Sequence, residues 1–275
     1  MITEAITDFG DVKAIRVGRS LAGRQLMTVI YYHLDEILID TGPYCARKSV
    51  AHYLGNHRIE KALLTHCHED HAGNVGLLLE KGIRVFGHEK SVAALSRRHH
   101  LKPYEYILFG KLESAQIESV ATKIQTKRHV LLPIHTPGHS HDHTVYYEPD
   151  RGWLFSGDLF LSPKIKIWRQ DEDMLKTIAS LERVLELDLT MLFCGHNPQL
   201  NYPKKALEMK KNQLLTLVET ASKLLTQGLS RREIIGRLCK GRERYFEKWL
   251  TLGDASYQNM VDAAISAAMQ KTRSE

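Results

Sequence analysis

The chain has 275 residues, of which 43% are hydrophobic, 25% are charged and only 8 are proline. These proportions are those of an ordinary globular protein, so they exclude disordered, collagen-like and low-complexity classes. The formal charge of +6 arises in residues 204–275, which carry 14 Lys and Arg against 8 Asp and Glu. We interpret this excess as the solvated faces of helices, and contact with an anionic partner is the alternative.

Export and membrane signals are absent from the sequence pattern. No apolar stretch approaches the roughly 20 residues that a membrane helix needs, and the first residues lack a basic segment followed by an apolar run. The four cysteines are scattered and form no CxxC pair, so they do not indicate a disulfide framework. The sequence therefore predicts no membrane span and a cytoplasmic location.

Residues 1–203 alternate between strand-like and helix-like segments, which predicts an α/β domain. Residues 99–127 mix aromatic residues with weak periodicity, so we interpret them as a variable insertion or a lid. The predicted strands are 25–32, 36–39, 61–65, 84–86, 129–135, 144–148, 153–156 and 191–194, and the predicted helices are 46–54, 74–81, 89–98 and 171–187.

The pattern becomes helical from Lys204 onward. Apolar residues recur at three- and four-residue spacing up to Gly228, which predicts a long amphipathic helix. Ser230 and Glu233 match a capping box that opens a second helix, and residues 254–269 predict a third. We therefore expect two units: a catalytic domain, residues 1–203, and a helical extension, residues 204–275. A lid, a dimer contact and a nucleic-acid contact are three alternative roles for the extension.

The strongest chemical signal is His66-Cys67-His68-Glu69-Asp70-His71, which follows the predicted strand 61–65 directly. Several ligand-type side chains within six residues converge only where a loop wraps around a cation. Imidazole and carboxylate groups together favour zinc, manganese or iron over calcium. The motif therefore predicts a metal site at the end of this strand.

Three further ligand-type residues each follow a glycine at the end of a predicted strand: His139, Asp158 and His196. Glycine at these positions permits a tight turn and a close approach of the backbone. Together with the HxHxDH motif, in this order and spacing, they resemble the metallo-β-lactamase superfamily over roughly residues 20–200. The resemblance includes Asp40, in Ile39-Asp40-Thr41-Gly42, as support for the metal-binding loop.

This resemblance implies a four-layer αββα sandwich with metals at one edge of the sheets, and it also implies a ligand set. Asp142-His143 looks like a segment found in hydrolase branches of the superfamily, where either residue would orient His139. The implied ligands are His66, His68 and His139 for the first metal, Asp70, His71 and His196 for the second, and Asp158 as the bridge between them.

The implied function is that of a glyoxalase II-like hydrolase with two metal ions, zinc in the first place and iron or manganese as alternatives. Two adjacent cations share a water, lower its pKa and clamp the attacking oxygen, so a bridging hydroxide would be the nucleophile. Asp70 would be the catalytic proton acceptor. The expected substrate is a small acyl ester, thioester or lactone.

Substrate recognition is less specified than the metal site. Cations in the loop after Asp158 suit an anionic group on the substrate, and an aromatic residue after Asp40 suits a pocket wall. Two other reactions remain open, namely RNA or DNA phosphodiester hydrolysis and iron-dependent sulfur dioxygenation, and a homodimer is a further expectation. The candidate substrate-binding residues are Tyr44, Lys164, Lys166 and Arg169.

Overall fold

The computed structural model describes residues 2–21, 24–198 and 201–274. Within them, one seven-stranded sheet has the strand order β1-β2-β3-β4-β5-β6-β7. The first three neighbouring pairs are antiparallel and the last three are parallel. Its strands are β1 (Ile2–Asp8), β2 (Val12–Leu21), β3 (Arg24–Leu34), β4 (Ile37–Ile39), β5 (Lys61–Leu63), β6 (Arg84–Gly87) and β7 (Glu118–Ser119).

A five-stranded sheet has the order β13-β11-β10-β9-β8, and a short antiparallel pair, β12 with β14, lies apart from both sheets. In the five-stranded sheet β11 and β13 are parallel, whereas the other neighbours are antiparallel. The strands are β8 (Ile124–Gln125), β9 (Val130–His135), β10 (Thr144–Glu148), β11 (Trp153–Gly157), β12 (Trp168–Arg169), β13 (Met191–Cys194) and β14 (Ala255–Ser256).

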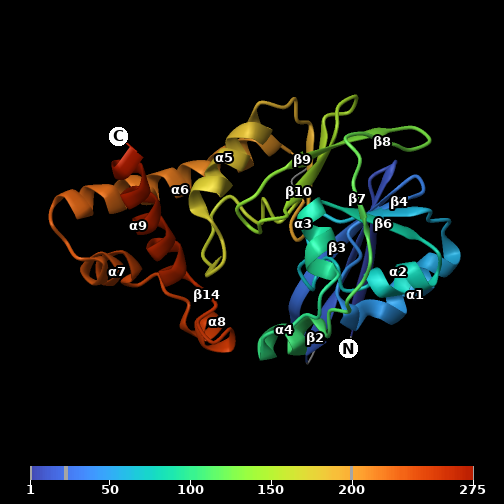
Figure 1. Cartoon of the computed structure of the whole chain (residues 1–275), viewed down its shortest axis with the longest axis horizontal. Coiled ribbons are helices and arrows are strands. Elements are labelled where there is room, and N and C mark those ends of the chain that lie inside the picture. The colour runs from blue at the N-terminus through green and yellow to red at the C-terminus, as the bar shows by residue number, and fades with distance from the viewer. Residues whose placement is uncertain (1, 22–23, 199–200, 275) are drawn as a thin grey trace.

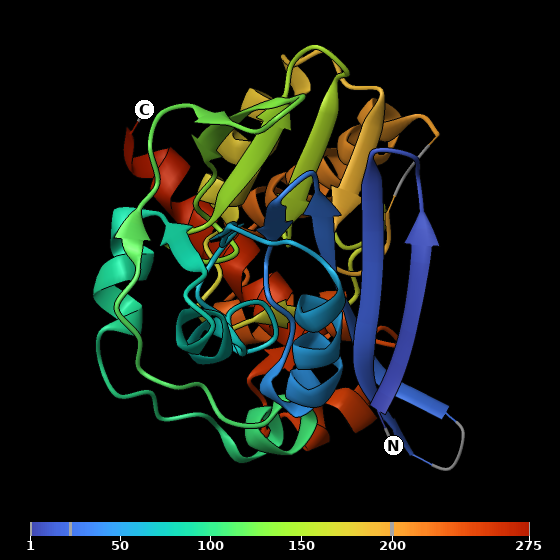
Figure 2. The same ribbon diagram turned by 90° about the vertical axis from the view of Figure 1, so that its right-hand side faces the viewer.

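Helices cover the outer faces of both sheets, as Figures 1 and 2 show, with α1 and α2 on one side of the strands and α5 and α6 on the other. The layers therefore run helix, sheet, sheet, helix, which confirms the predicted sandwich. The helices are α1 (Arg47–Asn56), α2 (Val75–Glu80), α3 (Glu89–Leu95), α4 (Pro103–Phe109), α5 (Met174–Leu185), α6 (Pro203–Thr226), α7 (Arg231–Cys239), α8 (Tyr245–Leu250) and α9 (Tyr257–Ser274), with a 3₁₀ turn η1 at Tyr44–Ala46.

Three clusters of buried hydrophobic side chains pack between these layers. One lies between the two sheets and includes the stacked rings of Phe155 and Phe193. A second lies between the seven-stranded sheet and helices α1 and α2. The third joins the five-stranded sheet to α5, α6, α7 and α9, so the C-terminal helices share a core with this sheet. The boundary at residue 203 stays a prediction.

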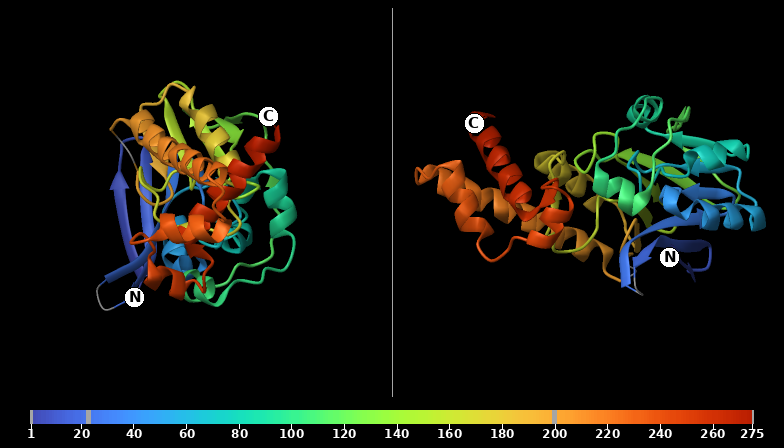
Figure 3. Two further views of the ribbon diagram at one scale, coloured as in Figure 1. Left: turned by 90° about the vertical axis from the view of Figure 1, so that its left-hand side faces the viewer. Right: turned by 90° about the horizontal axis from the view of Figure 1, so that it is seen from below.

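The molecule is elongated. The right-hand view of Figure 3, from below, shows the C-terminal helices at one end and α1 and α2 at the other. The capping box at Ser230 and Glu233 is confirmed, because the Ser230 side chain accepts from the Glu233 amide while the Glu233 carboxylate accepts from the Ser230 amide. None of the described helices has an apolar stretch long enough to cross a membrane.

Several structural elements were not predicted from the sequence, among them two long strands and two short helices. Strands β1 and β2 form an antiparallel pair at the N-terminus. Helix α4 lies within the segment interpreted as an insertion or lid, and α8 lies between the predicted second and third helices of the extension. Both helices are only six or seven residues long, which is too short for their apolar periodicity to stand out.

Candidate metal centre

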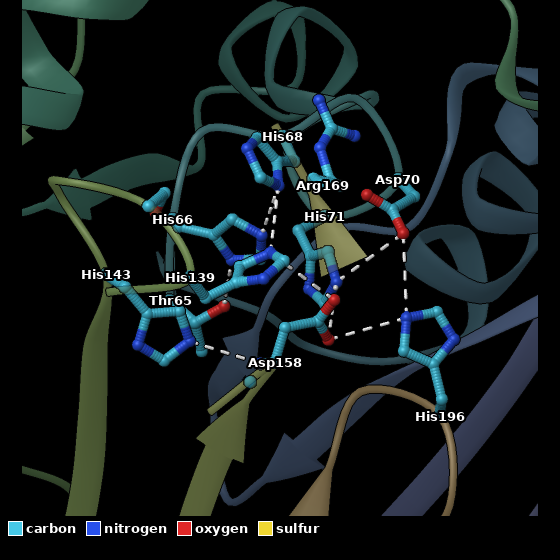
Figure 4. Close-up of polar contacts among 12 residues, drawn as sticks. Thr65, His66, His68, Asp70, His71, His139, His143, Asp158, Arg169 and His196 are labelled. Atoms are coloured by element: carbon cyan, nitrogen blue, oxygen red, sulfur yellow. Dashed lines mark hydrogen bonds and ion pairs between the residues drawn. The ribbon is translucent and has the colours of Figure 1, made fainter. Parts of the chain in front are cut away.

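The strands bring the candidate ligands to one edge of the two sheets. Strands β4 and β5 are parallel neighbours in one sheet, and β11 and β13 are parallel neighbours in the other. The carboxyl ends of parallel strands meet at the same edge, so the loops that follow them meet there too. These loops carry Asp40, the HxHxDH motif, Asp158 and His196. Figure 4 shows the side chains of the motif beside those of Asp158 and His196.

His66, His68 and His139 form a first donor set, in which one ring nitrogen of each residue lies within 4.8 Å of the others. His68 Nδ1 lies 3.0 Å from His66 Nε2 and 3.1 Å from His139 Nε2. Burial and the neighbouring imidazoles hold the pKa of His66 and of His68 well below the usual value. Converging neutral imidazole nitrogens are the ligands that transition metals and zinc prefer.

Asp70, His71, Asp158 and His196 form a second donor set, also within 4.8 Å of one another. Asp70 Oδ2 lies 3.7 Å from His71 Nε2 and 3.6 Å from His196 Nε2. Burial opposes the charged forms of His71 and His196, but the neighbouring carboxylates outweigh it and raise the pKa of both rings. Metal binding there would therefore release protons.

Asp158 lies between the two donor sets. Its Oδ2 is 3.6 Å from His139 Nε2 in the first set, and its Oδ1 is 3.2 Å from His71 Nε2 and 3.4 Å from His196 Nε2 in the second. Within the described residues, His71 Nε2 and Asp158 Oδ1 are buried yet have no hydrogen bond of acceptable geometry. Buried polar atoms without partners are costly, so these donor atoms fit the binding of metal cations, and Asp158 lies within reach of both sets.

Asp40 fixes the orientation of the HxHxDH loop through hydrogen bonds to one residue of that loop and to the residue before it. It is buried, with its backbone in the left-handed region at φ 64°. Its carboxylate accepts hydrogen bonds from the Thr65 amide at 2.7 Å, from the Thr65 hydroxyl and from His71 Nδ1 at 2.8 Å. His71 must then present Nε2 to the donor cluster. The structure therefore places Asp40 where the sequence predicted a supporting carboxylate.

His143 supports Asp158 and is not itself in a donor set. Its Nε2 accepts a hydrogen bond from the Asp158 amide at 3.1 Å, and its Nδ1 lies 2.9 Å from the Thr136 hydroxyl. Burial lowers the pKa of His143 to about 3, and His139 adds to this effect. A neutral imidazole that accepts from a backbone amide keeps the Asp158 loop in place. The sequence predicted that Asp142 or His143 would orient His139, and the contact of His143 with Asp158 was not foreseen.

Two glycines let the strand-end loops approach the cluster. A Cβ on Gly195 would lie 2.6 Å from His71 Cε1 and 2.8 Å from Asp158 Oδ1. A Cβ on Gly157, whose φ is +46°, would lie 2.7 Å from Thr65 Cβ. No larger residue fits at either place without displacing a neighbour. The glycine before Asp158 and the glycine before His196 thus have the steric role that the sequence indicated.

The four candidate substrate-binding residues are distributed over three places. Arg169 lines the cavity next to the donor sets, where its guanidinium donates to Glu105 at 3.2 Å. Lys164 and Lys166 are exposed and line a different surface pocket. Tyr44 lines another pocket, where Lys111 lies over its ring. The structure thus brings only Arg169, of these four, to the donor cluster.

Other residues at the site were missed by sequence reasoning. Glu69 is buried, and burial together with Asp70 and Glu105 raises its pKa to about 8. Lys210 of α6 is also buried and donates to the Leu159 carbonyl at 2.6 Å, directly after Asp158 in the chain. A lysine facing inward on an apolar stripe was the one signal that could have identified Lys210. The helical extension therefore contacts the back of the candidate metal centre.

Comparison with known proteins extends these observations. The family model described as "Metallo-beta-lactamase superfamily" matches residues 22–196. A metallo-beta-lactamase family protein from Thermus thermophilus has a similar structure, with a TM-score of 0.61 and 21% identity over 78% of this chain and 83% of that one. This likeness concerns the fold.

Three curated relatives are similar in sequence. The "Beta-lactamase-like protein 2 homolog" of Drosophila melanogaster is 31% identical over 61% of this chain and 56% of its own length. "Thioesterase pkgB" of Emericella nidulans is 29% identical over 72% of this chain and 49% of its own length. A "Hydroxyacylglutathione hydrolase" of Legionella pneumophila is 30% identical over 49% and 46%, respectively. The chain thus spans about half the length of these three relatives.

Proposed function

Because the chain belongs to the metallo-beta-lactamase superfamily, we propose that it is a dinuclear metal-dependent hydrolase that cleaves a thioester or a related acyl ester. The observation that carries the proposal is the arrangement of two donor sets with Asp158 between them. Zinc is the proposed metal, because it accepts imidazole and carboxylate ligands and, unlike iron, remains redox-inert during hydrolysis.

Two bound divalent cations would lower the pKa of a water molecule and polarise the carbonyl of the substrate. Around them, the residues of this chain hold the donor atoms in place. Asp40 orients His71, and the Thr28 carbonyl, 2.8 Å from His196 Nδ1, orients His196. Asp70 lines the open cavity and is the carboxylate we assign to accept the proton from the attacking water.

The thioester assignment is supported by two of the relatives, which are named as a thioesterase and as a hydroxyacylglutathione hydrolase. Charge in the cavity supports it as well. Glu172 and Glu247 line the cavity together with the carboxylates of the second donor set. These carboxylates would repel the backbone of a nucleic acid, so phosphodiester hydrolysis is the weaker candidate. Iron-dependent sulfur chemistry and a cytoplasmic location stay predictions.

The test compares the hydrolysis of thioester and phosphodiester substrates by the metal-loaded protein. We expect hydrolysis of an S-acyl-N-acetylcysteamine thioester, loss of that hydrolysis after chelation and dialysis, and its return when zinc is added. Single-stranded RNA and bis-p-nitrophenyl phosphate serve as phosphodiester controls and should be hydrolysed at least about a hundred-fold more slowly. Cleavage of RNA without cleavage of any thioester would refute the proposal.

A further inference from the structure

A cavity of about 320 Å³ opens beside the two donor sets. This volume is at the lower end of the range for small-molecule sites, about 300–1,000 Å³. One side of the cavity consists of donor residues from both sets. The other sides come from α4, from the segment 161–169 and from the segment 247–255, which includes the end of α8 and β14. We call this cavity the chamber.

The walls of the chamber are largely apolar. Helix α4 contributes Tyr104, Leu108 and Phe109, which form a small buried cluster of their own. Leu161 and Leu250 face the cavity from the two other segments. Figures 1 and 3 show α4 and α8 side by side, although they are far apart in the sequence. Segments on three sides therefore surround the cavity with hydrocarbon.

Polar contacts hold these walls together. The buried carboxylate of Asp254 accepts hydrogen bonds from the Tyr104 hydroxyl and from the Lys102 ammonium of the segment that begins α4. Asn259 Nδ2 donates to the Asp254 carbonyl at 2.8 Å and to the Trp168 carbonyl at 3.3 Å. The C-terminal extension is thus tied to α4 and to β12. Because these walls are already held in place, the binding of a ligand costs little conformational entropy.

The charges in the chamber do not favour an anionic ligand group. Among its described lining residues, Arg169 is the one Lys or Arg, and its guanidinium is paired with Glu105 at 3.2 Å and with Asp171 at 3.2 Å. Glu247, which also lines the cavity, is paired with Arg244. An apolar chain fits these walls. A phosphate or a second carboxylate would be buried there without a free cationic side chain to pair with, which is unfavourable.

We propose that the chamber binds the acyl chain of the substrate, so that the substrate class is an apolar medium-chain acyl group with its carbonyl at the donor sets. That the acyl group is hydrolysed there rests on the proposed function, but the binding of the acyl chain in the chamber does not. Each methylene that enters the chamber should raise the affinity by about fourfold, until the chamber is full.

The test measures the binding of straight-chain carboxylates, the acid products of such a reaction, to the metal-loaded protein by isothermal titration calorimetry. The series runs from acetate through butanoate, hexanoate and octanoate to decanoate. We expect the affinity to rise with chain length and then to level off. Leu250→Trp should lower the affinity for octanoate at least tenfold relative to acetate, because the larger ring fills the chamber.

Phe246→Trp is the matched control, since Phe246 is on the same helix, is 69% exposed and does not line the cavity. It should leave the dependence on chain length unchanged. Leu161→Trp fills the chamber from another segment and replaces Leu250→Trp if that variant does not fold by circular dichroism. An affinity that does not depend on chain length in the wild type, or chamber-filling variants that behave like the control, would overturn the inference.

Hydrolysis of thioesters with the same acyl chains separates this inference from the proposed function. Binding that depends on chain length without any thioester hydrolysis would refute the function and leave the acyl chamber supported. Hydrolysis at one rate for all chain lengths, together with an affinity that does not vary, would support the function and refute the chamber.

Discussion

Asp70→Asn is expected to lower kcat/KM for thioester hydrolysis by about 10²–10⁴, the usual contribution of a positioned general base. Asp70 lies in the second donor set, 3.6 Å from His196 Nε2, and also lines the open chamber. The amide of asparagine is nearly the same size but accepts no proton at neutral pH. The loss should therefore appear in the rate of reaction rather than in the fold.

Thermal unfolding distinguishes this explanation from a structural one. The Asp70 carboxylate repels Glu69 but attracts the imidazoles of His71 and His196, so removal of its charge has opposing effects on stability. The metal-free variant should therefore have a Tm close to that of the metal-free wild type. Asp188→Asn, at a carboxylate whose side chain is fully exposed, is the control and should change neither quantity. Full activity in Asp70→Asn would contradict the assigned role.

Asp158→Ala is expected to have the larger effect on metal binding. Asp158 faces His139 with one oxygen and His71 and His196 with the other, so its removal takes a ligand from both donor sets at once. It also removes the buried charge that offsets two imidazoles whose pKa is raised. We expect fewer than one metal ion per chain after dialysis and hydrolysis below the detection limit.

Ser230→Ala is a suitable control for Asp158→Ala, because it destabilises the protein at a place away from the donor sets. Ser230 is the N-cap of α7, and its hydroxyl accepts from the Glu233 amide. Loss of such a cap costs about 0.5–2 kcal/mol of stability. This variant should have a lower Tm but the metal content of the wild type. If Asp158→Ala also keeps its full metal content, Asp158 does not join the two sets.

The sequence predicted the layers and the edge at which the candidate ligands meet, because the ligands lie in loops that follow strands. The HxHxDH motif comes shortly after β5, and His196 comes shortly after β13, so local sequence alone placed them near strand ends. The order of ligand-type residues identified the family, which then implied the sandwich. The roles of these residues as ligands stay predictions, although their donor atoms converge in the structure.

The chamber could not be predicted in the same way, because no local pattern encodes it. Leu108 and Leu250 line one cavity although 142 positions separate them in the sequence. The contact of Asp254 with Tyr104 depends on how the C-terminal extension packs against the insertion. Lys164 and Lys166 illustrate the opposite case, since closeness to Asp158 in sequence did not place them at the cavity.

The central claim is that two redox-inert metal ions bind to this chain, and its most direct test is the metal content of protein purified without added metal. Elemental mass spectrometry of the wild-type chain, normalised to protein concentration by amino-acid analysis, gives this number. We expect close to two zinc ions per chain, held by His66, His68 and His139 on one side and by Asp70, His71 and His196 on the other, with Asp158 between them. A single iron ion per chain would contradict it.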